Sequence, residues 1–583
     1  MKSLLSIAVV SIGAVAFPHA VASQLQPGSD TLHLPGLSQP VEIRRDSWGI
    51  SHIYAESEHD LFFAQGFNAA RDRLFQFEIW RRRATGTMAE LIGSRALDHD
   101  LGARLLRFRG SLRDELAHYH PRGAEIVAAF VAGINAYIEL TEANPDLLPL
   151  EFRILGTKPE RWTPEIVISR HNGLFRNASR EIRMAKIVHS LGPAGAADLL
   201  DFQPETPILI PDSSVDLGLL TQPILRYYSA SRSSISFEPA DVLPAFRNNV
   251  GRDSTTTCRP PARCPSDVSP FELAALASTI GSNNWVVAGG RAFNQYPMMA
   301  NDPHRVLRVP SLRYWVHLVG PGWNVIGGGE PALPGVSIGH NEFGAWGLTI
   351  FETDQEDLYV YDTNPQNPRQ YRYGGEWVDM EIERQNIAVR DAPSVEVELR
   401  YTRHGPVLHQ DSLRHKAYAL RAAWLEVGGA PYLASLRMDQ ATSWEEFRAA
   451  CDYFRTPSEN MVWADRNGNI GWQATGITPL RRGWDGMLPV PGDGRYEWDG
   501  FLRILDLPQV TNPPEGWIAT ANANNLPRGY RPVVGYEWST PFRISRISEV
   551  LASGRRLTLM DMQQLQQDEL AIAARLLVPL LAP

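Results

Sequence analysis

The stretch Gly281-Ser282-Asn283-Asn284-Trp285-Val286-Val287-Ala288 lies where the character of the sequence changes. Residues 229–281 before it are rich in Ser, Thr, Pro and Arg and show little periodic apolar patterning, which is typical of a linker. Strand signals follow it, at residues 284–288 and at 461–472, where Asn467-Gly468 predicts a hairpin turn. A cut before Ser282 would therefore make this serine the first residue of a strand.

An N-terminal serine carries its own base. A serine hydroxyl is a weak nucleophile until a base removes its proton, and the α-amino group of an N-terminal serine can do this. The pKa of such an amine is about 7.7–8.0, so much of it is neutral near neutral pH. Before cleavage the hydroxyl can attack the Gly281 carbonyl, because glycine tolerates the strained backbone that this step requires. Gly-Ser-Asn is also a common turn, so the motif by itself assigns no function.

The composition is that of a soluble globular protein. Of the 583 residues, 44% are apolar and 21% are charged, and the mean hydropathy is −0.23, so large-scale disorder is not expected. The length suits one large multilayer domain or several ordinary ones. The net charge of −9 gives no overall basic field, so nucleic acid is not an expected partner.

The first residues predict a secretory signal peptide over 1–22. Lys2 precedes an apolar stretch at residues 4–17, and the small residues Ala20-Val21-Ala22 form a typical cleavage site. The apolar stretch is shorter than the roughly 20 residues that span a bilayer. We therefore expect a secreted protein, periplasmic in a Gram-negative bacterium, with no membrane span once the signal is removed.

A series of motifs between residue 41 and the C-terminus matches one family in order and spacing. The motifs before the linker are Arg44-Arg45-Asp46, Trp48-Gly49-Ile50, Ala64-Gln65-Gly66 and Arg71-Asp72-Arg73-Leu74-Phe75-Gln76. Those after it are Ser282-Asn283-Asn284-Trp285-Val286, Asn301-Asp302-Pro303-His304, Gly339-His340-Asn341, His404-Gly405-Pro406-Val407 and Ala464-Asp465-Arg466-Asn467-Gly468-Asn469-Ile470. By these motifs the chain resembles the penicillin acylase (penicillin amidase) family of N-terminal nucleophile hydrolases, which includes acyl-homoserine lactone acylases and cephalosporin acylases.

The resemblance implies an α+β fold. In this family two antiparallel sheets lie between helical layers in a four-layer αββα sandwich, with further helices in the small chain, whereas the local patterns alone indicate only a mixed α and β protein. It implies a heterodimer cut from one precursor: a small chain of 23–228, an excised spacer of 229–281 and a large chain of 282–583. Relatives usually continue past the position of Pro583, so we expect a large chain shortened at its C-terminus.

The resemblance also assigns the reacting groups. Ser282 is the nucleophile, freed by cleavage between Gly281 and Ser282. The side-chain amide of Asn460 and the backbone N–H of Ile350 match the two donors that hold the oxyanion. A buried asparagine beside a strand more often satisfies backbone groups, which is the alternative reading of Asn460.

Further positions match groups around the nucleophile. Arg481 matches an arginine near the catalytic amine, with the adjacent Arg482 as the alternative. His304 stands where relatives carry glutamine or histidine, so we expect it to orient the serine or the substrate. Phe175 matches an aromatic residue of the acyl pocket, although core packing explains such a residue equally well.

An acidic run, Glu352-Thr353-Asp354-Gln355-Glu356-Asp357, has two interpretations. Runs of this kind are usually solvated loops. The resemblance instead implies a structural calcium ion bound by Asp354, Asp357, the carbonyl of Glu356 and the distant Glu181. Ligands that are all oxygen suit this hard cation. No organic cofactor is expected.

The implied reaction is hydrolysis of the amide bond of N-acylated small molecules, such as a β-lactam side-chain amide or an acyl-homoserine lactone. One alternative is an unprocessed or truncated homologue that binds ligands without catalysis. A second is a serine hydrolase built on Ser337 in Gly335-Val336-Ser337-Ile338-Gly339, a nucleophile-elbow pattern. An elbow needs a buried strand before it and a helix after it, and Pro334 and Gly344 disfavour both.

Overall fold

The strand predicted after Ser282 is present as β3 (Asn283–Val287). The structure is a computed structural model that describes residues 31–170, 176–247, 281–304 and 309–581. All described helices and strands belong to the unit Gly36–Pro583, and Met1–Pro35 forms a separate unit.

β3 is the middle strand of a three-stranded antiparallel sheet, between β22 (Trp517–Thr520) and β4 (Met298–Asp302). Successive strand residues point to opposite faces. Trp285 and Val287 accordingly belong to one apolar cluster and Val286 to another. Ser282 has the same parity as Val286, so its side chain points to the Val286 face.

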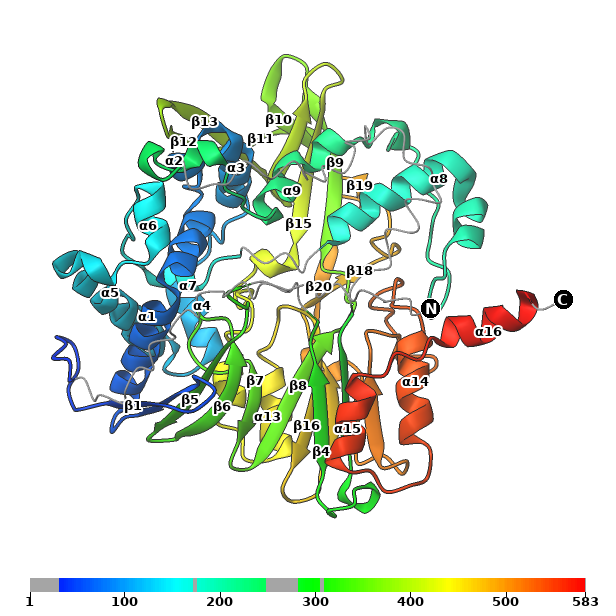
Figure 1. Cartoon of the computed structure of the whole chain (residues 1–583). Coiled ribbons are helices and arrows are strands. Elements are labelled where there is room, and N and C mark those ends of the chain that lie inside the picture. The colour runs from blue at the N-terminus through cyan, green and yellow to red at the C-terminus, as the bar shows by residue number, and fades with distance from the viewer. Residues whose placement is uncertain (1–30, 171–175, 248–280, 305–308, 582–583) are drawn as a thin grey trace, which may run out of the picture. The chain divides into compact units, whose positions relative to one another are not determined.

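A nine-stranded sheet lies against that face. β3 and β4 pack against β8 and β16, and β3 also contacts β17. Figure 1 shows β4 beside β8 and β16. Every neighbouring pair in this sheet is antiparallel except β2 and β5. Its strands in order are β1 (Glu42–Arg45), β2 (Ser51–Tyr54), β5 (Tyr314–Gly320), β6 (Trp323–Gly329), β7 (Ile338–Asn341), β8 (Gly344–Ile350), β16 (Glu459–Asp465), β17 (Ile470–Ala474) and β21 (Gln509–Thr511).

Helices cover the other faces of these two sheets. α14 (Phe542–Leu551) packs on β22 and α15 (Leu559–Gln566) on β4, where they share an apolar cluster with Trp285. α13 (Trp444–Cys451) packs on β16 and β17, and α1 (Glu58–Thr85) packs on β5. The predicted α+β class is confirmed.

α1 and α5 (Gly123–Ala143) form a close helix pair. A Cβ atom placed on Gly66 would lie 2.0 Å from the carbonyl oxygen of Phe130, and one placed on Gly133 would lie 1.9 Å from that of Phe63. The two backbones therefore touch. α5 is long and apolar enough to cross a membrane. However, 61% of its most apolar 18-residue stretch is buried inside the protein, as in a core helix.

A second large sheet packs against α8 and α9. Its strands in order are β11 (Glu376–Asp379), β10 (Asn367–Tyr373), β9 (Glu356–Asn364), β15 (Lys416–Ala422), β14 (Gly405–Asp411), β13 (Ala392–Thr402) and β12 (Glu381–Val389), with β19 (Val490–Pro491) parallel to β9. β18 (Thr478–Arg481) and β20 (Trp498–Leu502) pair separately. The other helices are α2 (Ala89–Ile92), α3 (Leu97–Leu105), α4 (Leu112–Tyr119), α6 (Leu150–Leu155), α7 (Pro164–Val167), α8 (Asn177–Leu199), α9 (Arg226–Arg232), α10 (Pro244–Arg247), α12 (Ser435–Met438) and α16 (Ile572–Leu581).

The interval predicted as a linker is partly folded. Its first residues complete α9, and α10 follows within it. The tightly paired hairpin expected at 461–472 is confirmed as β16 and β17. The signal peptide and residues 248–280 lie outside the described residues.

Candidate active site

Ser282 lies in a buried polar cluster drawn from distant parts of the chain. Its backbone N–H donates to Oδ1 of Asn522 at 2.6 Å, and its carbonyl accepts from Nη1 of Arg543 at 2.7 Å. Its Oγ accepts from the backbone N–H of His304 at 3.2 Å. With 7% of its surface exposed, Ser282 is fixed at every polar atom.

Asn522 links Ser282 to the end of β8. Its Nδ2 donates to the Ile350 carbonyl at 2.9 Å, while its Oδ1 accepts from Nη2 of Arg543 at 3.1 Å as well as from Ser282. Because Nδ2 has an acceptor and Oδ1 has two donors, these partners fix the orientation of the Asn522 side-chain amide. The backbone φ of Asn522 is 59°, in the left-handed region that non-glycine residues seldom adopt. Such strain is often found at functional sites.

Arg543, at the first turn of α14, brings a positive charge to the serine. Nη1 also donates to Oδ1 of Asn283 at 2.8 Å, so one guanidinium spans two consecutive residues. Burial lowers the pKa of Arg543, and the nearby Asp302 carboxylate opposes this effect. Arginine nonetheless stays charged in proteins.

His304 contacts the serine through its main chain. The imidazole Nε2 lies 2.8 Å from Oδ2 of Asp302, which holds the ring in place. The structure thus places His304 beside Ser282, as the resemblance implies, with its backbone N–H as the contacting group.

Gly281 is in a crowded position. A Cβ atom there would lie 1.9 Å from Nη2 of Arg543 and 2.8 Å from Oδ1 of Asn522. A larger residue before Ser282 would therefore displace the two side chains that hold the serine.

The assignment of Asn460 to the oxyanion does not agree with this geometry. Its Nδ2 donates to the Ile350 carbonyl at 3.1 Å and to Oγ1 of Thr349 at 3.2 Å, and its Oδ1 accepts from Nε1 of Trp472. None of its hydrogen bonds reaches Ser282. The asparagine that contacts Ser282 is Asn522, because β22 leads it to the start of β3.

The arginine assignment is corrected in the same way. Arg481 binds Asp357 through Nε at 2.8 Å and lies 3.5 Å from Asp354, with no contact to Ser282. Arg482 is 82% exposed and pairs with Asp499. Arg543 takes the place beside the serine. Phe175 lies outside the described residues.

Ser337 has none of the surroundings of a nucleophile elbow. It lies between β6 and β7, with no helix after it, and its carbonyl accepts from Nε1 of Trp346. The neighbouring His340 contacts the carbonyl of Asn341. This serine is part of a sheet connection.

Three carboxylates predicted as calcium ligands are buried near Arg481, namely those of Glu181, Asp354 and Asp357. The Glu181 carboxylate accepts from the backbone N–H of Leu358 at 3.1 Å, and Arg481 contacts the other two. Nη2 of Arg481 also lies 3.4 Å from the Glu356 carbonyl. Among the described residues, no three His, Cys, Asp or Glu side chains converge as a metal site in this arrangement.

The carboxylates of this cluster are hard to ionise together. Burial raises the pKa of Asp354 to about 8 and that of Asp357 to about 6, although Arg481 opposes both shifts. Burial, followed by the charges of Asp357 and Asp354, raises the pKa of Glu181 well above its usual range. Ionising all three carboxylates would therefore place more negative charge in the cluster than Arg481 alone neutralises.

Comparison with known proteins settles the family. The penicillin amidase family model matches residues 40–583. The chain belongs to the penicillin amidase family.

Relatives in this family carry two kinds of name. Penicillin acylase 2 proenzyme of Pseudomonas sp. (strain SE83) is 31% identical over 95% of this chain and 67% of its own length. Acyl-homoserine lactone acylase QuiP of Pseudomonas aeruginosa is 28% identical over 94% of this chain and 63% of its own length. The chain thus spans about two thirds of the length of these relatives. A solved structure of penicillin G acylase from Alcaligenes faecalis matches 49% of this chain at 28% identity, with a TM-score of 0.46.

Asn522 and Arg543 are the site residues that sequence reasoning missed. Asn522 opens the asparagine-rich stretch Asn522-Ala523-Asn524-Asn525 directly after a strand, a visible signal. Arg543 starts a helix whose apolar residues recur at helical spacing, so a polar side chain there is unremarkable.

The ion pairs of Arg481 give a first prediction. Arg481→Gln is expected to lower the free energy of unfolding by about 3–5 kcal/mol, because removal of one partner leaves buried carboxylates without their counter-charge. Arg482→Gln, one residue away but exposed, is expected to change it by less than about 0.5 kcal/mol. Urea unfolding of both variants measures the difference. Equal effects would mean that Arg481 is not the buried partner.

Proposed function

We propose that this chain is a self-processing acylase precursor in which Ser282 becomes an N-terminal nucleophile. One observation carries the proposal: Asn522 and Arg543 converge on the main-chain N–H and carbonyl of Ser282, and His304 contacts its hydroxyl. A serine in an ordinary turn has no need of such a buried arrangement. The substrates would be N-acylated small molecules, in keeping with the acylase names of the relatives.

Self-cleavage would begin at the Gly281–Ser282 peptide bond. Oγ of Ser282 attacks the Gly281 carbonyl, nitrogen leaves as the new α-amine, and water hydrolyses the resulting ester to the Gly281 carboxylate. The crowding at Gly281 supports this step, since glycine alone fits between Arg543 and Asn522. The released α-amine would keep the hydrogen bond that the Ser282 N–H now donates to Oδ1 of Asn522.

Amide hydrolysis would then use the same groups. Oγ attacks the substrate carbonyl, the α-amine takes the proton and passes it to the leaving amine, and water releases the acid. Nδ2 of Asn522 and the backbone N–H of Ile350 would hold the oxyanion, a role that preorganised donors perform without reorganisation. Arg543 would keep the amine and Asn522 in position.

The fold and maturation fit the same proposal. The sheets containing β3 and β8 face each other, and helices cover their outer sides, as a four-layer αββα sandwich requires. We propose that export, removal of 1–22 and excision of a spacer that begins after the folded residues of α9 and α10 and ends at Gly281 give a heterodimer. An unprocessed binding protein is the alternative outcome.

Intact mass and N-terminal sequencing test the cleavage. The wild-type chain is expected to yield a large fragment beginning at Ser282, and Ser282→Ala is expected to remain a single chain with no amidase activity. Ser337→Ala serves as the matched control and should mature and hydrolyse amides normally. A wild-type protein that hydrolyses amides while still in one piece would rule the mechanism out.

Single-turnover rates separate the two asparagines. Asn522→Ala is expected to reduce amide hydrolysis about 10²- to 10³-fold, the usual effect of losing one oxyanion donor. Asn460→Ala removes the bonds to Trp472 and Ile350 and should mainly lower thermal stability. The reverse pattern would return the oxyanion role to Asn460.

We also propose that the acidic cluster binds calcium. Its donors are all oxygen, and Oδ1 of Asp357 is buried without a hydrogen-bond partner. Arg481 supplies one positive charge for three carboxylates, while Arg180 is paired with Glu352. A divalent cation would balance the rest. The ion would hold Glu181 to Asp354 and Asp357, which lie on opposite sides of the cut.

Chelation tests the calcium site. EDTA is expected to lower the melting temperature, and added calcium should restore it, because a ligand that binds the native state stabilises it. Asp357→Asn should remove the calcium-dependent part of the shift. Asp362→Asn, an exposed position on the same strand, should keep it. No calcium-dependent shift in the wild type would exclude the site.

A further inference from the structure

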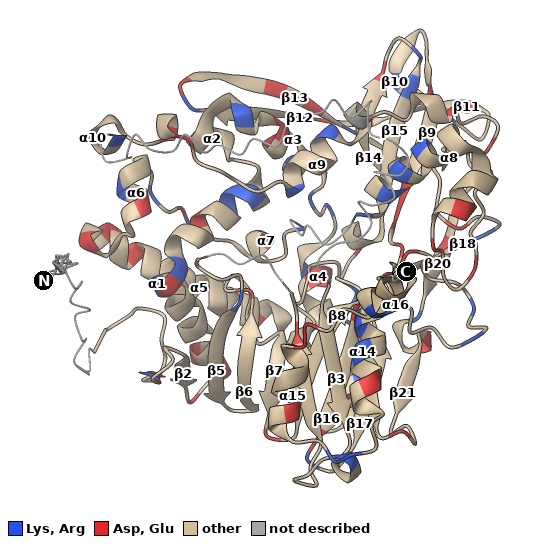
Figure 2. Ribbon diagram, turned by 45° about the vertical axis from the view of Figure 1, so that its right-hand side comes forward, with Lys and Arg blue, Asp and Glu red and all other residues tan. Residues whose placement is uncertain are grey.

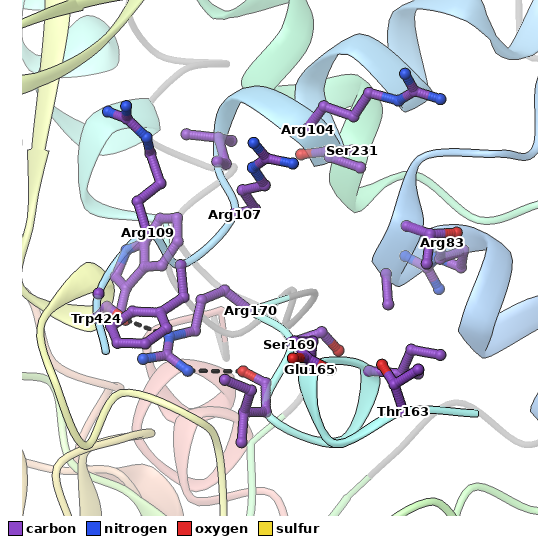
Figure 3. Close-up of a pocket in the computed structure, with 18 of the residues that line it drawn as sticks. Arg83, Arg104, Arg107, Arg109, Thr163, Glu165, Ser169, Arg170, Ser231 and Trp424 are labelled. Atoms are coloured by element: carbon purple, nitrogen blue, oxygen red, sulfur yellow. Dashed lines mark hydrogen bonds between the residues drawn. The ribbon is translucent and has the colours of Figure 1, made fainter. Parts of the chain in front are cut away.

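A cavity of about 540 Å³ lies apart from the cluster around Ser282, with which it shares no residue. Its walls come from the end of α1, the end of α3 with residues 106–110, α7 with residues 168–170, the end of α9, and Trp424 (Figure 3). The volume is in the range of pockets for small organic ligands. An inorganic ion alone would leave most of it empty.

The lining is strongly basic in an acidic protein. Acidic and basic residues are spread together over the helices and sheets (Figure 2), and the whole chain has a net charge of −9. The cavity, in contrast, is lined by two glutamates, Glu165 and Glu383, and by the arginines Arg83, Arg104, Arg107, Arg109, Arg170 and Arg232. A local excess of positive charge attracts anions.

Some of these arginines are occupied by the fold itself. Arg170 binds Glu115 and the carbonyls of Ile168, Trp424 and Glu426. All three nitrogens of its guanidinium are therefore engaged in holding the wall together.

Arg232 is different. Its Nη1 donates to the Tyr228 carbonyl at 3.0 Å, but its buried Nε and Nη2 have no hydrogen-bond partner. The nearest carboxylate oxygen, Oε1 of Glu356, is 3.7 Å from Nη2, and the Glu356 carboxylate already accepts from Tyr228 and Trp424. Buried donors of this kind normally have a partner, so Arg232 keeps hydrogen-bonding capacity at the cavity wall that the fold does not use.

Two neighbouring arginines, Arg104 and Arg107, add to the positive charge of the cavity. The hydrogen bonds of Arg104 go to neutral acceptors, among them the carbonyls of Gly86 and Asn386. Burial lowers its pKa, and the charges of Asp100 and Glu90 oppose this shift. Arg107 is half exposed and pairs only with Glu383 at the cavity. Phe108 also lines the cavity, and the Arg170 guanidinium lies 4.2 Å from the centre of its ring.

We propose that this cavity binds an organic oxyanion, a carboxylate or a phosphate ester, whose charged group is held by Arg232 and Arg107 and whose apolar part contacts Phe108. Planar guanidinium groups match both kinds of oxyanion through paired N–H donors. The proposal does not depend on catalysis at Ser282.

Isothermal titration calorimetry on the full-length protein tests it. The probes are 2-naphthoate and 2-naphthyl phosphonate, and 2-naphthylmethanol is the neutral control. At least one anion is expected to bind, and the tighter one identifies the oxyanion class. Arg232→Gln should weaken its binding at least tenfold. Arg113→Gln, which removes the same charge from a side chain 89% exposed, should leave binding unchanged.

Binding at the catalytic cluster is distinguished by the variants. An anion held near Ser282 would bind Arg232→Gln normally, and that result overturns the proposal, as does equal binding of 2-naphthylmethanol or no binding of either anion. If Arg232→Gln fails to fold by circular dichroism, Arg107→Gln takes its place with the same expected loss. Unchanged binding in a folded Arg107→Gln would then also overturn the proposal.

Discussion

The face-to-face packing of β3 on β8 and β16 is the constraint on which the rest of the site depends. Val286 is buried against the nine-stranded sheet and Trp285 against the helices, so β3 cannot rotate or slide without exposing one of them. Ser282 precedes this strand directly and is fixed by it. The same contact brings the ends of β8 and β22, with Ile350 and Asn522, to the serine.

Local sequence patterns predicted the elements whose determinants are local. The strand after Ser282 and the hairpin at Asn467-Gly468 follow from short motifs. The place of His304 near the serine follows only from the family resemblance. Asn460 and Asn522 both lie at strand ends, and neither composition nor spacing shows which strand end reaches the serine. That choice is made by sheet order, over a separation of 240 residues between Ser282 and Asn522. The same holds for Arg481 and Arg543, since each is buried against partners remote in sequence.

Buried arginines perform distinct tasks in this protein, and their partners distinguish them. Arg481 faces carboxylates and compensates charge. Arg543 faces carbonyl and amide oxygens and positions a backbone. Arg232 retains unpaired donors beside a cavity. Because the desolvation of a guanidinium must be offset by its surroundings, the set of acceptors around each one indicates its role better than its position in the sequence.

The parallel pairing of β2 with β5 joins strands that precede and follow Ser282 within one sheet. In the intact chain this pairing forms inside a single molecule. After a cut at Ser282 the same sheet would join two polypeptides, so unfolding would release two separate pieces whose reassembly depends on their concentration. In dilute solution the two separated pieces would seldom meet, so unfolding of the cleaved protein would be practically irreversible. The lifetime of the folded mature protein would then be set by its rate of unfolding.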